Sequence, residues 1–257
     1  MCVILQDGLD RSEATASHSI VRCGSKSMPF RYEREMLEPA VQWLRGEGLM
    51  VKKEFPTPWG ICDLAGCSLN KNRVRQRLKL RQTKPIRSQL RVYLLSLIPD
   101  EEQGSATNAE QLHEHFGTYL DRTRIEVELG RLARDRFIEE HAPGAYFKRN
   151  GWMPLHKRLV AVELKLTRVD DALHQAINNL GFADESYVGL PADVANRLLR
   201  SKRQANFLDR GIGVLAIAED RCAVVLRPRK RVPARERSTQ AYSVERFWLA
   251  HLKGTEA

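Results

Sequence analysis

The spacing of apolar residues divides the chain into helical and extended segments. Across residues 31–47 they recur every three or four positions, which is typical of an amphipathic helix, and Pro39 there indicates a kink or a later helix start. Residues 49–55 and 61–69 have the composition of strands, and the Pro- and Gly-containing segment 56–60 joins them. The first part of the chain therefore predicts a helix followed by a hairpin.

The same spacing predicts further strands and helices in the second half. A continuous apolar run over residues 159–166 has the length and composition of a buried strand. After it we expect, in order, a helix at about 170–180, a strand at 187–190, a helix at 192–207, strands at 213–218 and 222–226, and a terminal helix around 244–252. Strands that alternate with helices in this way predict a mixed α/β fold built in layers.

The middle of the chain differs in composition. Residues 70–91 hold nine Lys and Arg side chains and no acid. A short hairpin over 136–149, with Pro143-Gly144 at its turn, is predicted at the far end of this block. Between the two, helical spacing predicts segments at about 87–98, 107–116 and 121–135.

These changes in pattern predict a discontinuous core with an inserted module. The core comprises residues 31–70 and 152–228, and the module comprises residues 71–151. Residues 1–30, rich in Ser, Gly and Asp, predict a loose tail. Residues 229–257 predict a basic segment followed by a helix.

Charge narrows the classes of partner. The 257-residue chain has a formal net charge of +10, which favours a polyanion, nucleic acid first and an anionic membrane surface second. No apolar run approaches the roughly 20 residues of a membrane span, so we expect no membrane insertion. The five cysteines lack zinc-site spacing and are expected to be reduced thiols, which favours a cytoplasmic location.

The strand expected at 159–166 carries two charged side chains. Alternation along a strand places Val160, Val162, Leu164 and Leu166 on one face and Ala161, Glu163 and Lys165 on the other. An acid and a base on such a buried strand are costly to leave unpaired. They predict either an internal ion pair or a reactive site.

Two more carboxylates lie on elements that could reach this strand. Asp63 lies in the second strand of the expected hairpin, where its alternative role is a turn or capping carboxylate. Glu33 falls on the apolar stripe of the first helix, although it could also lie in an exposed first turn. Carboxylate oxygens suit Mg²⁺, with Mn²⁺ as a substitute, and such a metal activates water for attack on phosphate. Lys165 could orient that water or stabilise charge on the phosphorane.

The order Glu33, Asp63, Glu163-Leu164-Lys165 and Gln175 resembles the PD-(D/E)xK nuclease superfamily. The resemblance covers about 31–69 and 152–228. It implies a restriction-endonuclease-like α/β/α core with a mixed central sheet, interrupted by a mostly helical insertion. It also implies that Glu33, Asp63 and Glu163 hold the metal, with Glu35 or Glu38 as alternatives to Glu33. Lys165 would position the water and Gln175 would support the site.

Two features depart from the family pattern. Cys62 stands where the motif has proline. Asp63 and Glu163 are also about a hundred residues apart, whereas the family usually has a tight hairpin. The module must therefore begin and end close together in space.

The inserted module resembles a winged helix-turn-helix, a family in which the third helix enters the major groove and the hairpin touches the backbone. The resemblance implies DNA contacts from Thr123, Arg124, Arg131 and Arg134 on the third helix and from Lys148 and Arg149 on the hairpin. The basic run is expected to contact phosphate through Arg73, Arg75, Arg77, Lys79 and Arg81. The alternatives are a helical subdomain for dimerisation or gating, and a solvated linker.

Together these features predict a Mg²⁺-dependent DNA endonuclease that acts on duplex DNA in restriction, phage defence or repair. A homodimer is expected by analogy with relatives that cut both strands. The alternatives are a non-catalytic DNA-binding regulator on an inactive nuclease scaffold and an RNA-directed nuclease.

Overall fold

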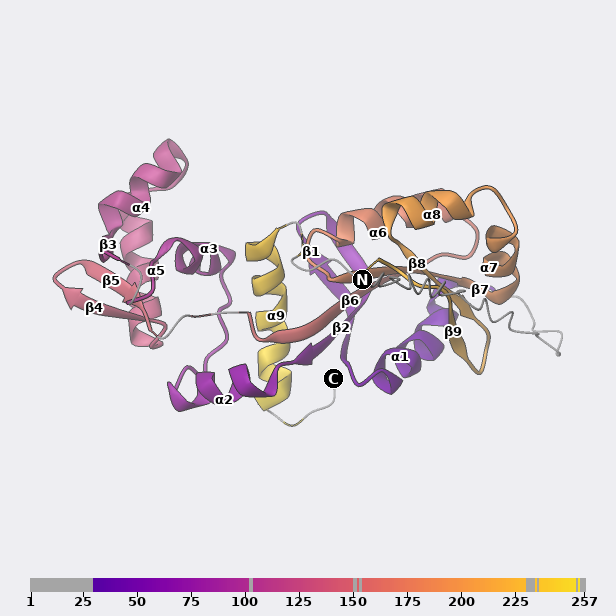
Figure 1. Ribbon diagram of the computed structural model, residues 1–257, viewed down its shortest axis with the longest axis horizontal. Helices are drawn as coiled ribbons and strands as arrows, with labels where there is room; N and C mark the ends of the chain where they lie inside the picture. The colour runs from indigo at the N-terminus through magenta and orange to yellow at the C-terminus, as the bar shows by residue number, and fades with distance from the viewer. Residues whose placement is uncertain are drawn as a thin grey trace, which may run out of the picture.

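The computed structural model describes residues 30–101, 104–149, 152, 154–229, 234, 236–252 and 254. The expected loose tail at 1–30 lies outside these residues except for Phe30, and part of the basic segment after 229 also lies outside them. Figure 1 shows an elongated molecule, with a sheet flanked by helices in one half and a smaller group of helices and strands in the other.

A six-stranded mixed sheet forms the larger half. Its strands, in spatial order, are β1 (Met50–Thr57), β2 (Gly60–Leu69), β6 (His156–Leu164), β7 (Glu185–Pro191), β8 (Gly213–Ile217) and β9 (Cys222–Leu226). The pairs β6–β7 and β7–β8 are parallel, and the other neighbouring pairs are antiparallel. The prediction of a mixed α/β fold is confirmed.

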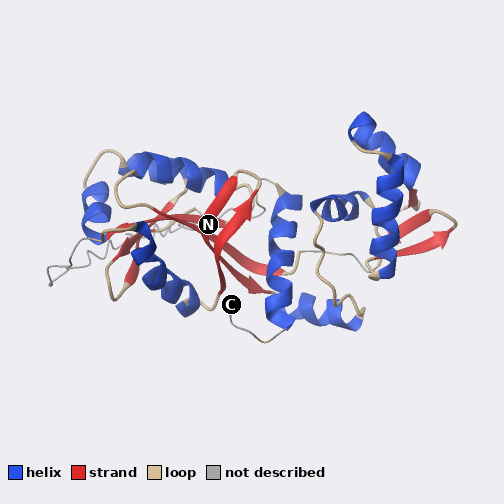
Figure 2. Ribbon diagram, turned by 180° about the vertical axis from the view of Figure 1, so that it is seen from behind, coloured by secondary structure: helices blue, strands red, loops and turns tan. Residues whose placement is uncertain are grey.

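Helices cover both faces of this sheet (Figure 2). On one face the 3-10 turn η1 (Glu33–Met36) and helix α1 (Leu37–Gly46) pack against Val160, Val162 and Leu164 of β6. On the other face lie α6 (Val169–Asn179), α7 (Ala192–Leu199) and α8 (Gln204–Arg210). Because Pro39 is tolerated only in the first turn of a helix, α1 begins at Leu37, so the expectation of a later helix start is confirmed.

The basic run forms a helix. Asn70 caps α2 (Lys71–Lys79) by accepting hydrogen bonds from the amides of Asn72 and Arg73. The alternative of a solvated linker is therefore wrong for this stretch, since Val74 of α2 is buried against the core.

The remaining module has three helices and a small sheet. The helices are α3 (Gln89–Leu97), α4 (Ala109–Phe116) and α5 (Arg122–Arg134), with a 3-10 turn η2 (Gly117–Tyr119) between the last two. The strands β3 (Thr107–Asn108), β4 (Ile138–Ala142) and β5 (Ala145–Lys148) pair in the order β3-β5-β4. The expected helices and hairpin are confirmed, whereas β3 is too short for its apolar pattern to predict.

Helix α9 (Arg237–Leu252) stands between the two halves in both views (Figures 1 and 2). Ala241 packs in the apolar cluster of the module, while Val244, Phe247 and Trp248 pack in a cluster of the core. The helix begins at Arg237, although the apolar pattern predicted a start near Val244. The pattern missed the first turns because they bury polar residues, among them Thr239, Gln240 and Ser243. Helix α9 therefore contacts both core and module.

Within the described residues, no helix has the length and apolar character needed to cross a membrane.

Candidate active site

Strands β2 and β6 lie side by side despite their separation in sequence. Leu64 pairs with Val162, and the antiparallel register continues to Ser68 and Arg158. The main-chain amide of Leu164 donates a hydrogen bond of 2.7 Å to Oδ2 of Asp63. Asp63 therefore lies beside the strand that carries Glu163, as the sequence required of an insertion that begins and ends close together.

Glu163 is buried on the face of β6 that meets α6. Its side chain is 3% exposed, and Nδ2 of Asn179 donates a hydrogen bond of 2.6 Å to its Oε1. Burial, reinforced by the negative charge of Asp63, raises the pKa of Glu163 to about 7. The hydrogen bond from Asn179 therefore compensates the ionised form of this carboxyl group only in part.

The pKa of Asp63 is also raised. Burial raises its pKa above the ordinary value, against the opposing effect of the hydrogen bond from Leu164. Both carboxylates are partly desolvated, and the charge of Asp63 disfavours the ionisation of Glu163. A bound cation would stabilise their charged forms.

Lys165 follows directly after β6 and points to Glu33. Its Nζ donates to Oε2 of Glu33 over 3.3 Å, and the amide of Leu166 donates to Oε1 of the same carboxylate over 3.4 Å. The lysine side chain is 17% exposed and that of Glu33 is 44% exposed. Glu33 therefore orients the side chain of Lys165. The structure pairs Glu33 with Lys165, and the charge of Glu33 also contributes to the raised pKa of Asp63, so its expected role as a metal ligand remains a prediction.

The helix residue that reaches the site is not the expected one. Gln175 is exposed on α6, whereas Asn179, one turn later, contacts Glu163. The contact with Glu163 is made by Asn179, and a supporting role for Gln175 remains a prediction. A signal for it existed in the sequence, because Asn179 lies three residues after Ala176 and seven after Ala172, on the stripe that faces the sheet.

The donor set fits a cation that keeps most of its own water. Among the described residues, no three His, Cys, Asp or Glu side chains are grouped closely enough to hold a metal ion by themselves. Asp63 and Glu163 supply two carboxylates, and Mg²⁺ characteristically binds through one or two carboxylates together with water and phosphate oxygens. These two residues fit Mg²⁺ and do not form an all-protein cage.

Cys62 occupies the position where the motif has proline. It is 1% exposed, its Sγ donates to the carbonyl of Leu64 over 3.2 Å, and burial raises the pKa of its thiol. A buried neutral thiol at this position acts as a small apolar side chain.

Arg77 is a structural residue, which corrects its assignment to phosphate binding. Its side chain is 3% exposed and forms a paired contact with both carboxylate oxygens of Glu245, at 2.5 and 2.9 Å. Its guanidinium also lies 4.4 Å from the ring centroid of Trp248 and 5.1 Å from that of Phe137.

The other basic residues of α2 divide by exposure. Arg73 donates to the carbonyl of Pro154 over 2.5 Å. Arg75, Lys79 and Arg81 are exposed. The outer side of α2 therefore remains accessible to a polyanion.

The residues of the module that were predicted to contact DNA differ in exposure and in whether they have an acidic partner. Thr123 and Arg124 are exposed at the start of α5. Four candidates have acidic partners: Arg131 with Glu128 at 2.7 Å, Arg134 with Asp135 at 3.8 Å, Lys148 with Asp100 at 3.8 Å and Arg149 with Glu139 at 3.3 Å. Lys148 is only 13% exposed, so its expected place on the accessible hairpin is corrected.

Comparison of the chain with protein-family models, with curated proteins and with solved structures finds no match in any of the three. The function is therefore inferred from the geometry of the described residues.

Proposed function

We propose that this protein is a Mg²⁺-dependent DNA endonuclease that hydrolyses phosphodiester bonds, with Asp63 and Glu163 as the metal ligands. The observation that carries the proposal is the pairing of β2 with β6, which brings two carboxylates with raised pKa values together beside Lys165. Such a set suits chemistry on a phosphate group. The surrounding α/β/α layers support a restriction-endonuclease-like core.

Each residue has a distinct part. A bound Mg²⁺ would polarise the phosphate and lower the pKa of a coordinated water. Asn179 fixes the rotamer of Glu163, and the amide of Leu164 fixes that of Asp63. The ammonium of Lys165, oriented by Glu33, is placed to hold the attacking water or the phosphate oxygens.

The module supports DNA as the substrate. Its order α3, β3, α4, α5, β4, β5 is that of a winged helix-turn-helix, and Thr123 and Arg124 are exposed at the start of its third helix. Duplex DNA is therefore the substrate to test first, with RNA of the same sequence beside it.

The test is cleavage of supercoiled plasmid, linear duplex and matched RNA in Mg²⁺ or Mn²⁺. We expect nicking or cutting of DNA that EDTA abolishes, and a loss of at least about 100-fold in Asp63→Asn and Lys165→Met. Lys202→Gln, an exposed change between α7 and α8, is the matched control and should cut like the wild type.

Three outcomes contradict the proposal. Cutting that survives both Asp63→Asn and Lys165→Met arises elsewhere. Tight DNA binding without cleavage in either metal indicates a binding protein on an inactive scaffold, and cleavage confined to RNA indicates an RNA-directed enzyme.

A further inference from the structure

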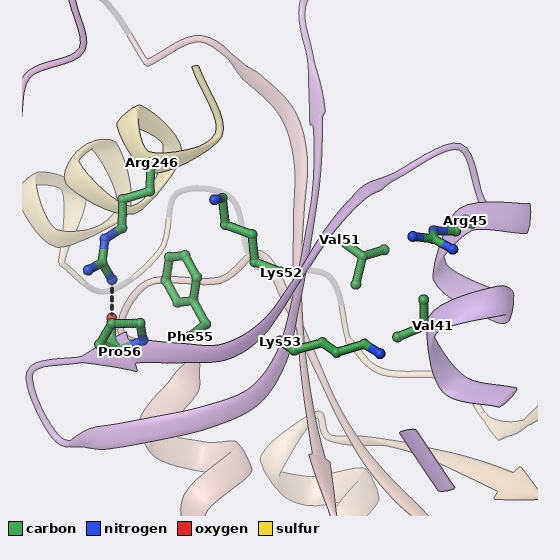
Figure 3. Close-up of a pocket in the computed structure, with 8 residues that line it drawn as sticks. All are labelled: Val41, Arg45, Val51, Lys52, Lys53, Phe55, Pro56 and Arg246. Carbon is green, nitrogen blue, oxygen red and sulfur yellow. Dashed lines mark hydrogen bonds between the residues drawn. The ribbon is translucent and has the colours of Figure 1, made fainter. Parts of the chain in front are cut away.

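A basic pocket lies across the edge strand β1, outside the residues assigned to DNA above. Its volume is about 410 Å³, and it opens between α1 and α9 (Figure 3). It is lined by Val41, Arg45, Val51, Lys52, Lys53, Phe55, Pro56 and Arg246.

Four of these lining residues are cationic and none is acidic. Arg45 comes from α1, Lys52 and Lys53 from β1, and Arg246 from α9. Figure 3 shows Lys52 directed toward Arg246 and Lys53 directed toward α1. Glu38 lies near the rim, 3.6 Å from Nζ of Lys53. The pocket therefore retains an excess of positive charge.

Arg246 is held in place before any ligand arrives. It donates to the carbonyl of Pro56 over 2.7 Å and lies 5.0 Å from the ring centroid of Phe55. Phe55 itself is 1% exposed, so the ring that Arg246 contacts is buried. A guanidinium fixed by a carbonyl and a ring, with other donors still free to bond, suits recognition of an oxyanion.

Protection of a sheet edge explains part of this pattern. Lysines, proline and a distorted residue are common on edge strands, and Glu54 of β1 has φ 49°. That function accounts for Lys52, Lys53 and Pro56. It does not require arginines from two separate helices to converge on the same pocket.

The pocket adjoins the candidate active site. Lys53 pairs with Leu64 and Phe55 pairs with Cys62, so Asp63 lies on β2 between the partners of two lining residues. On its other side Arg246 also lines a second cavity of about 270 Å³ together with Arg87. Cationic side chains thus run from Lys53 on β1, the neighbour of the strand that carries Asp63, past Arg246 of α9 to Arg87 before α3.

We propose that Arg45, Lys52, Lys53 and Arg246 bind backbone phosphates of the nucleic acid that flank the bond to be cut. The ligand is a phosphodiester, and the surface guides the strand between the core and the module. This inference rests on the proposed function for its ligand, but its test does not require cleavage.

The test is fluorescence anisotropy of a labelled duplex of about 20 base pairs in EDTA, over a series of salt concentrations. We expect Lys52→Gln/Lys53→Gln to raise Kd about tenfold near 100 mM salt. It should also reduce the slope of log K against log salt by about 2, since each lost phosphate contact removes about 0.9. The matched control is Arg200→Gln/Lys202→Gln, two exposed cations beyond α7, which packs near the opposite end of the sheet and should bind like the wild type.

The competing explanations give different results. If the β1 variant and the control bind equally well with the same slope, the inference is overturned, whatever the cleavage assay shows. If about 10 mM inorganic phosphate at constant ionic strength displaces the duplex, the pocket takes free phosphate and the strand path is wrong. If only binding of polyglutamate is lost in the β1 variant, the occupant is an acidic protein segment. Loss of duplex binding in a protein that never cuts DNA supports the phosphate path and rejects the nuclease.

Discussion

Glu163 is an acid held almost out of contact with water, and the cost of that placement depends on pH. Its pKa is about 7 in the folded protein and near the ordinary 4.5 in an unfolded chain. Between these values the folded protein retains a proton that the unfolded chain releases. The free energy of unfolding therefore falls as pH rises from 4.5 to 7, by about 1.4 kcal/mol for each pKa unit of difference.

Glu163→Gln should stabilise the metal-free protein at alkaline pH. Glutamine keeps an acceptor for Asn179 and removes the ionisation, so we expect a gain on the order of 2 kcal/mol at pH 8 and almost none at pH 5. The measurement is Tm in EDTA at both pH values, where the gain corresponds to about 4–8 °C. An equal shift at both pH values would show that packing and not ionisation sets the effect.

At the scale of one helix, α6 offers a direct comparison of two amides. Asn179→Ala removes the hydrogen bond to buried Glu163 and should cost about 1–3 kcal/mol, whereas Gln175→Ala on the exposed side should change stability by less than about 0.5 kcal/mol. Urea denaturation measures both. A larger loss in Gln175→Ala would restore that residue to the site.

Helices α2 and α9 are joined by a buried ion pair. Arg77→Met leaves the carboxylate of Glu245 with a single remaining donor, the amide of Ile86, so we expect a loss of about 3–5 kcal/mol. Arg75→Met, two residues away and exposed, is the matched control and should be near neutral. Adding Glu245→Gln to Arg77→Met should recover part of the loss. A neutral Arg77→Met would mean that the pair is not buried in solution.

Most helices and strands could be predicted because the spacing of apolar residues along the chain is a local property. The strand at 159–166, the helix at 170–180 and the hairpin before the basic run all follow from residues within a few positions of one another. The partnership of Asp63 and Glu163 follows from the order of the motif. The order of the motif does not say that the two residues are close in space. The pairing of β2 with β6 shows that they lie on neighbouring strands.

The burial of polar and charged side chains could not be predicted, because it depends on partners far away in the sequence. The run containing Arg77 is uniformly basic in sequence, yet Arg77 is buried because Glu245, 168 residues later, meets it. The first turns of α9 bury polar side chains that find partners elsewhere, such as Gln240, which donates to Asp184 over 2.9 Å. Burial of such residues depends on tertiary contacts, which periodicity does not encode.

At the scale of the whole molecule, α9 connects the two halves. It contributes to the clusters of both the core and the module, and Trp248 on it donates to the carbonyl of Thr83 over 2.8 Å, in the segment between α2 and α3. We therefore expect the wild type to unfold in a single calorimetric transition.

Ala241→Asp should separate that transition into two. Ala241 is 3% exposed and packs α9 against the module, so a buried carboxylate there costs several kcal/mol at that contact while leaving the core cluster of Val244, Phe247 and Trp248 in place. The matched control, Arg237→Asp, puts the same side chain on the exposed first turn of α9, where it favours the helix dipole and should keep a single transition. Differential scanning calorimetry distinguishes the two. A single transition in Ala241→Asp, lowered in Tm as a whole, would mean that other contacts, such as Arg77 with Glu245, suffice to join the halves.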